Sequence, residues 1–265
     1  MPLAVITGAS SGIGASFARK LAARGFDLLL AARREDRLRS LATELHDLYH
    51  IKAEPFVVDL IDDTDRERLV ERLRTAPDLA LLVNNAGFGT MGNFFDADVR
   101  QQEAMHRLHI LNTVILTRAA LSNLAARAQP RTGIINVSSV AAFGTSPDNV
   151  AYCASKAWMN AFTQGLSMEL GARDSPVMMQ ALCPGFTLSE FHDVLGMDRG
   201  RIPSWLWMTP DFVVEESLRG WDRGQLIVVP GWRYKLAVAF MRISPASLMR
   251  RTTIALTRRY RRKAR

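Results

Sequence analysis

The chain has 265 residues, of which 48% are hydrophobic, and it carries a formal net charge of +8. This length suits one large α/β domain or two small ones, and the hydrophobic content is that of a globular protein with a full core. No run of about eighteen apolar residues is present, which excludes a transmembrane helix. Two cysteines make no disulfide framework, and the N-terminus lacks the basic start of a signal peptide, so we expect a cytoplasmic protein.

The positive charge belongs to the C-terminal end of the chain. Residues 233–265 contain eleven Lys or Arg and no Asp or Glu. The preceding 232 residues contain the other 23 basic residues and all 26 acidic ones, a net charge of −3. The sequence therefore predicts a body of ordinary charge followed by a basic tail.

Short apolar runs alternate with helical patterns along the first 230 residues. Strands are expected at 3–7, 27–32, 56–59, 79–84, 133–138, 177–183 and 226–230. The first helix is expected to end at a capping Gly25, and others to cover 34–49, 64–75, 96–127 and 150–170. Apolar strands that alternate with helices are typical of a parallel sheet covered on both faces. We predict a doubly wound α/β fold in one domain, residues 1–231, followed by a C-terminal extension, residues 232–265.

A glycine-rich turn follows the first expected strand. Gly8, Gly12 and Gly14 have the spacing Gly-x3-Gly-x-Gly at a strand-to-helix junction. Such a turn lets the backbone approach a pyrophosphate, which is then stabilised by the helix N-terminus. Ser10 and Ser11 add hydroxyls that can bond phosphate oxygens. A tight turn without a ligand is the alternative.

Tyr152 and Lys156 lie four residues apart in the helix expected at 150–170, and therefore on one face of it. A phenol with a pKa of about 10 is a poor acid or base at neutral pH. An ammonium group beside it favours the phenolate and lowers that pKa. The pair predicts a proton donor and acceptor, although the same spacing also occurs on solvated helices.

Five motifs, in their order and separations, resemble the short-chain dehydrogenase/reductase family: TGASSGIG at 7–14, NNAG at 84–87, Ser139, Tyr152-x3-Lys156 and Pro184-Gly185. The match covers residues 3 to about 230. The resemblance implies a seven-stranded Rossmann-like fold that binds a nicotinamide dinucleotide at the C-terminal edge of the sheet. It also implies a homodimer or homotetramer assembled through the two long helices.

The resemblance assigns catalysis to Asn112, Ser139, Tyr152 and Lys156. Ser139 and Tyr152 would hydrogen-bond the substrate carbonyl, and Tyr152 would donate the proton. Lys156 would lower the pKa of the phenol and bond the nicotinamide ribose, while the cofactor supplies the hydride. Asn112 would hold a water that relays protons to Lys156. The alternative for Asn112 is a core amide bonded to a carbonyl.

The resemblance also implies a set of cofactor contacts. The glycine-rich turn would hold the phosphates, the end of the third strand the adenine, the end of the fourth the adenosine ribose, and the segment after the sixth the nicotinamide. The residues are Gly8, Ser10, Ser11, Gly12, Ile13, Gly14, Arg33, Arg34, Asp59, Leu60, Asn85, Ala86, Gly87, Tyr152, Lys156, Pro184, Gly185 and Thr187.

The end of the second strand indicates which nicotinamide cofactor is used. In a Rossmann fold an acidic residue there holds the ribose 2′-hydroxyl, whereas a nearby Arg favours the 2′-phosphate. Here the strand ends Ala32-Arg33-Arg34. Ala32 does not repel a phosphate, and a guanidinium binds one bidentately. We therefore expect NADP(H) in preference to NAD(H), with two solvated arginines as the alternative.

The segment 187–210 is expected to form a lid over the substrate. It carries many apolar side chains, and apolar residues elsewhere can add to the wall: Phe191, Val194, Leu195, Met197, Trp205, Leu206, Trp207, Met208, Phe88, Met91 and Phe143. A largely apolar pocket suits a hydrophobic ketone, aldehyde or secondary alcohol of fatty-acyl, steroid-like or aromatic type. His46/His50 and His106/His109 have helical spacing for metal pairs, but no further ligands complete them, so no metal site is expected.

The tail, 233–265, reads as a basic amphipathic segment after a break at Pro245. Met249, Thr253, Leu256 and Tyr260 fall on one helical face with arginines on the others. Such a helix can lie on the anionic inner surface of a membrane, dock an acidic partner, or be a solvated end. No nucleic-acid partner is expected, because no aromatics are interleaved with the arginines for base stacking.

These features together favour an NADP(H)-dependent carbonyl reductase or alcohol dehydrogenase. A 3-ketoacyl reductase of lipid metabolism is the closest rival. A non-catalytic, dinucleotide-sensing protein docked on a membrane is the alternative from another class, and the presence of all four implied catalytic residues disfavours it.

Overall fold

The computed structural model describes residues 1–126, 132–191, 200, 202–245, 247 and 249–255. Its centre is a seven-stranded parallel sheet in the order β3-β2-β1-β4-β5-β6-β7. The strands are β1 (Leu3–Thr7), β2 (Asp27–Ala32), β3 (Ala53–Val57), β4 (Leu79–Asn84), β5 (Gly133–Val137), β6 (Met178–Leu182) and β7 (Ile227–Val228). The strand order reverses between β1 and β4, the point at which open α/β sheets bind ligands.

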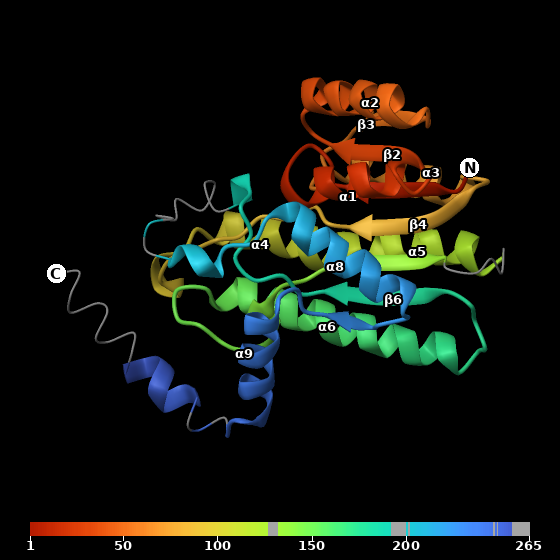
Figure 1. The fold of residues 1–265 in the computed structure, drawn as a ribbon. Helices are drawn as coiled ribbons and strands as arrows, with labels where there is room; N and C mark the ends of the chain where they lie inside the picture. The colour runs from red at the N-terminus through yellow and green to blue at the C-terminus, as the bar shows by residue number, and fades with distance from the viewer. Residues whose placement is uncertain (127–131, 192–199, 201, 246, 248, 256–265) are drawn as a thin grey trace.

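Helices cover both faces of the sheet (Figure 1). The core on one face joins α1 (Gly12–Ala22), α2 (Glu35–Tyr49) and α8 (Pro210–Asp222) to the strands through residues such as Phe17, Leu38 and Val213. The core on the other face lies under α3 (Asp63–Thr75), α5 (Asn112–Ala125) and α6 (Val150–Gly171). The doubly wound fold predicted from the sequence is confirmed.

Gly25 ends α1 in the way its sequence position indicates. The helix stops at Ala22, and Gly25 adopts a φ of +80° in the left-handed region. The N–H of Phe26 donates to Leu21 O at 3.1 Å, and that of Gly25 donates to Ala22 O at 2.9 Å. This is the Schellman pattern, in which a glycine beyond the last turn lets the chain reverse and satisfies two terminal carbonyls.

Two expected elements differ in the structure. The third strand covers Ala53–Val57 instead of 56–59, so Pro55 lies inside it. Because β3 is the edge strand and pairs only with β2, the missing N–H of Pro55 costs no ladder bond. The long helix expected at 96–127 is divided into a 3-10 turn (Phe94–Asp96), α4 (Val99–His106), a π-helical turn η2 (Arg107–Leu111) and α5.

The C-terminal extension starts with α9 (Trp232–Ile243), which packs against the body. Tyr234, Val238 and Met241 share an apolar cluster with Cys183 and with Phe143 of the 3-10 helix η3 (Val140–Phe143). The helix ends at Ile243, Ser244 is extended, and helical structure continues over residues 249–255. This break coincides with Pro245, as expected. Leu256 and Tyr260 of the expected stripe lie outside the described residues.

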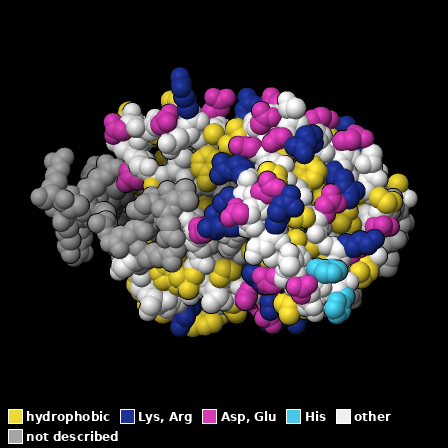
Figure 2. Space-filling model, turned by 90° about the horizontal axis from the view of Figure 1, so that it is seen from above, with side chains coloured by type: hydrophobic (Ala, Val, Ile, Leu, Met, Phe, Trp, Pro, Cys, Tyr) yellow, Lys and Arg dark blue, Asp and Glu magenta, His cyan; other side chains and the backbone are white. Residues whose placement is uncertain are grey.

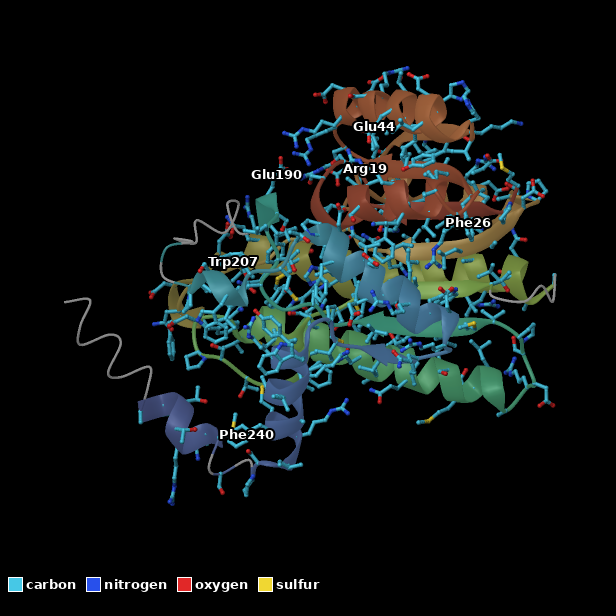
Figure 3. All side chains as sticks on the ribbon, viewed as in Figure 1. Arg19, Phe26, Glu44, Glu190, Trp207 and Phe240 are labelled. Carbon is cyan, nitrogen blue, oxygen red and sulfur yellow. The ribbon has the colours of Figure 1, made fainter. Side chains whose placement is uncertain are left out.

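Charge on the body is mixed in sign. Figure 2 shows Lys and Arg interspersed with Asp and Glu over the face that it displays. Arg19 of α1 and Glu44 of α2, labelled in Figure 3, form one such pair at 2.7 Å. In the part of the chain that the structure describes, no helix is long and apolar enough to cross a membrane.

Candidate active site

The glycine-rich turn between β1 and α1 is packed too tightly for larger residues. Gly8 and Gly12 have φ values of +67° and +55°, and a Cβ on Gly14 would lie 2.2 Å from Gly8 O. The Asn85 amide after β4 donates to Thr7 O at 2.8 Å and to Gly8 O at 3.2 Å. The turn backbone is therefore fixed to the next strand, with the N-terminus of α1 open towards a cleft, which suits a pyrophosphate.

Two arginines follow β2 and differ in how firmly they are held. The Arg34 guanidinium donates to Ser10 Oγ and Ser11 Oγ, both at 2.9 Å, and to Glu190 at 2.7 Å. Arg33 is 71% exposed, and its nearest carboxylate is Asp59 at 4.0 Å. The Arg33 guanidinium is therefore more available than that of Arg34 to bind a 2′-phosphate.

Glu190, labelled in Figure 3, is a site residue that the sequence did not reveal. It forms ion pairs with Arg37 and Arg34, which together lower the pKa of its carboxyl to about 2. It thereby joins the segment after β6 to the start of α2 across the phosphate-binding turn. Nothing in its sequence neighbourhood marks it, because its partners lie more than 150 residues away in the chain.

Ser139, Tyr152 and Lys156 meet at the base of the cleft. Ser139 follows β5, and its hydroxyl lies near enough to the phenol of Tyr152 on α6 to act on the pKa of that phenol. Lys156 is one turn further along α6, with Nζ 5.8 Å from the centre of the Tyr152 ring. Its ammonium donates to Val137 O at 2.8 Å. Three of the four side chains that the resemblance assigned to catalysis are therefore neighbours.

The pKa values in this trio differ from the sequence-based expectation. Burial raises the pKa of Tyr152 to about 12, although the Ser139 hydroxyl opposes the shift. Burial also lowers the pKa of Lys156 to about 8. The net shift of the Tyr152 pKa is therefore upward, because desolvation of the phenolate is the largest effect, and the expected lowering by Lys156 stays a prediction.

Asn112 does not reach the cleft. Its Nδ2 donates to Leu60 O at 2.6 Å, and the residue is not among those that line the cavity. The Nδ2 bond matches the carbonyl-bonded amide that we gave as the alternative, while the buried Oδ1 has no partner among the described groups, so the implied water-holding role stays a prediction. His109, three residues earlier in the π-helical turn η2, lines the cavity instead.

The hydrogen bonds of His109 define its tautomer. Ser155 Oγ donates to Tyr152 O at 2.8 Å, so at 2.9 Å it accepts a hydrogen bond from His109 Nδ1–H. Burial and the positive charge of Lys156 hold the pKa of His109 well below its usual value, and the ring is neutral. Nε2 is then a buried acceptor that has no partner among the described groups and lies against Gly87.

The segment after β6 is fixed to the extension by Tyr234 of α9. The Tyr234 hydroxyl accepts from Phe186 N–H at 3.0 Å and donates to Leu206 O at 2.7 Å. Its ring covers Gly185 so closely that a Cβ there would lie 2.1 Å from Cζ. Tyr234 thus joins the segment expected at the nicotinamide to Leu206, in the segment expected to form the lid. Of the apolar residues expected in the lid, Val194, Leu195 and Met197 lie outside the described residues.

The cleft along the C-terminal edge of the sheet has a volume of about 940 Å³, near the upper end for ligand sites. Every residue expected at the cofactor or in catalysis lines it, except Gly14 and Asn112. Apolar side chains and residues of the extension also line it: Phe88, Met91, Phe143, Phe191, Met241, Met249, Arg250 and Thr253. No cluster of metal-ligating side chains occurs in the described ranges.

The fold and this cleft define a Rossmann-type oxidoreductase site. Residues 2–199 match the family model for short chain dehydrogenases. The chain is 26% identical over 241 residues to a 3-oxoacyl-[acyl-carrier-protein] reductase of Aquifex aeolicus, covering 86% of this chain and 96% of that one. A short-chain dehydrogenase from Sphingobium yanoikuyae, solved with NADPH, superposes with a TM-score of 0.83 at 30% identity, covering 93% and 97% of the two chains.

A third similar protein is the bulky-bulky ketone specific alcohol dehydrogenase from Comamonas testosteroni. It superposes with a TM-score of 0.78 at 28% identity, covering 93% of this chain and 96% of that one. The protein belongs to the short-chain dehydrogenase family, as the sequence motifs indicated. It is an oxidoreductase that uses a nicotinamide dinucleotide.

Proposed function

We propose that the protein is an NADP(H)-dependent reductase of hydrophobic carbonyl compounds, with Tyr152 as the general acid. The observation that supports the proposal is the proximity of Ser139 and Tyr152 in a cleft that is also lined by apolar side chains such as Phe88, Phe143 and Phe191. Both hydroxyls can donate to one carbonyl oxygen, which orients the substrate and stabilises the negative charge that develops on that oxygen.

The protonation states favour the reductive direction. With its pKa at about 12, the Tyr152 phenol is protonated at neutral pH and can give its proton to the oxygen as the alcohol forms. The bound nicotinamide supplies the hydride to the carbonyl carbon. Lys156 can return a proton to Tyr152, since a lowered pKa of about 8 makes its ammonium a better acid than an ordinary lysine.

The preference for NADP(H) rests on Ala32, Arg33 and Arg34. No carboxylate stands at the end of β2 to repel a 2′-phosphate, and Arg33 extends from this point with most of its surface exposed. The similar structure from Sphingobium yanoikuyae, which holds NADPH, supports this preference.

The decisive experiment is a screen of NADPH oxidation against neutral ketones and aldehydes with aromatic, steroid-like or long alkyl groups. We expect turnover with members of this panel and a lower KM for NADPH than for NADH. Absence of turnover with every carbonyl, despite NADPH binding, would favour a dinucleotide-sensing protein.

A 3-ketoacyl reductase is the second candidate, because a 3-oxoacyl-[acyl-carrier-protein] reductase is among the similar proteins. A panel that contrasts simple ketones with 3-ketoacyl thioesters separates the two. Higher kcat/KM for the thioesters would favour the second candidate.

A further inference from the structure

The outer face of α9 carries an exposed apolar stripe. Trp232, Leu236, Phe240 and Ile243 are 64, 62, 60 and 81% exposed. At 100° per residue, these four side chains fall within an arc of about 80°. Phe240, labelled in Figure 3, lies on α9 at the lower edge of the molecule in that view. Single exposed apolar residues are ordinary, but a contiguous stripe marks an interaction surface.

The stripe is not needed to hold α9 on the body. The helix is attached through its opposite face, where Tyr234, Val238 and Met241 pack in the apolar cluster with η3. The Tyr234 hydroxyl adds the two hydrogen bonds to the segment after β6 and to the lid. The helix is therefore held firmly on the body with its apolar stripe facing outward.

Basic residues flank the stripe, and the segment has no acidic ones. Arg233 lies on one side of the stripe, and Lys235 and Arg242 lie on the other. All eleven charged residues of 233–265 are basic. An apolar stripe bordered by Lys and Arg suits a surface that combines an apolar interior with anionic groups.

A second copy of this chain is a poorer match for the stripe. A two-fold contact would bring the same face of α9 from each protomer together. The basic residues beside each stripe would then face one another without any carboxylate of the segment to offset the repulsion. An anionic lipid surface has the opposite charge and accepts the apolar side chains at the boundary of its acyl chains.

We propose that α9 docks the protein on an anionic lipid surface, with Trp232, Leu236, Phe240 and Ile243 inserted at the headgroup boundary. Its twelve residues span about 18 Å, too short to cross a bilayer, so the helix lies in the plane of the surface. This assigns the membrane contact to α9. Met249 and Thr253, expected on the lipid-facing stripe of the tail, line the cleft instead.

If the protein is the proposed reductase, docking through α9 also brings the substrate cleft close to the lipid. Met241 and Ser244, near the end of α9, line the same cleft as Tyr152. A docked protein therefore holds the outer part of the cleft close to the lipid surface. A hydrophobic carbonyl compound dissolved in the lipid then has a short path to the catalytic residues.

The test is co-sedimentation of the full chain with vesicles of phosphatidylcholine alone or of phosphatidylcholine mixed with phosphatidylglycerol. We expect binding to the mixed vesicles, weakened by high salt. The double variant Leu236→Ser/Phe240→Ser should bind about 30-fold more weakly, because two large apolar side chains no longer enter the lipid. The control is Met168→Ser/Phe95→Ser, which alters side chains that are 72% and 94% exposed elsewhere and should bind like the wild type.

Circular dichroism and NADPH oxidation with a water-soluble ketone confirm that each variant is folded, and both should be unchanged in Leu236→Ser/Phe240→Ser. Equal vesicle binding by this variant and the wild type would overturn the proposal. So would a lipid-free wild type that is a larger oligomer than the variant by light scattering, since the stripe would then be covered by a second copy.

Arg251→Glu, on the exposed C-terminal helical segment, should weaken vesicle binding without touching α9. Vesicle binding is measured without substrate, so it stands or fails independently of the reductase activity.

Discussion

Replacing Lys156 by Met should stabilise the fold at neutral pH while removing turnover. The folded protein holds the pKa of this buried lysine at about 8, against 10.5 in an unperturbed lysine. Each unit of lowering corresponds to about 1.4 kcal/mol, so burying the charged form costs about 3 kcal/mol. The hydrogen bond from Nζ to Val137 O returns about 1 kcal/mol. The variant should therefore unfold with a free energy about 2 kcal/mol higher than the wild type.

The sign of the pH dependence follows from the lowered pKa. The cost of the buried ammonium is fully present below pH 8, declines as pH rises from about 8 towards 10.5, and vanishes above that range. Urea unfolding of the wild type and of Lys156→Met at a series of pH values, without added cofactor, measures this difference in the free energy of unfolding. Lys235→Met, at an exposed ion pair with Glu216, is the control and should change stability by less than about 0.5 kcal/mol. Lower stability of Lys156→Met than of the wild type at pH 7 would refute this prediction. So would a stability difference between the two proteins that grows above pH 8.

Four further substitutions test the site. Arg33→Ala should raise the KM for NADPH roughly tenfold or more and leave that for NADH unchanged, because a charge-assisted hydrogen bond to the 2′-phosphate is lost; equal effects on both would contradict the assignment. Tyr234→Phe removes two hydrogen bonds and should lower the free energy of unfolding, measured in urea, by about 2 kcal/mol. In steady-state kinetics it should raise the KM for the substrate more than it lowers kcat. His109→Leu should lower kcat roughly tenfold, because its ring packs against that of Tyr152 and helps to position the phenol. Asn112→Leu should lower mainly stability through the lost bond to Leu60 O; a fall in kcat without loss of stability would instead support the implied proton relay through Asn112.

Much of the fold could be predicted because its signals are local. The strands of the sheet are apolar runs between helices, and the observed bounds of β1, β2 and β4 agree with those runs. β3 was placed too late, at 56–59 instead of Ala53–Val57, and Pro55 lies inside the observed strand. Its tolerance there depends on β3 being an edge strand, which is a property of the sheet order and not of the local sequence.

The cofactor turn and the Tyr152–Lys156 pair could be located because their residue spacing reflects turn and helix geometry, whereas Ser139 could be located only through the resemblance to the family. The position of His109 in the wall of the cleft could not be predicted in this way. A π-helical turn inserts a residue into the helical repeat, so regular spacing no longer tells which side chain faces the cleft. The ion pairs of Glu190 and the position of Tyr234 depend on contacts between distant segments, which no local pattern contains.

Tyr152→Phe gives the most direct test of the central claim, that Tyr152 protonates a carbonyl oxygen during reduction by NADPH. The substitution removes one hydroxyl and keeps the ring, whose centroid lies 5.7 Å from that of the Phe191 ring. NADPH binding by fluorescence and turnover of a ketone identified in the screen are measured on the same protein. We predict that NADPH binding is kept and that kcat falls by roughly a thousandfold or more. A variant that binds NADPH and reduces the ketone at the wild-type rate would contradict the account.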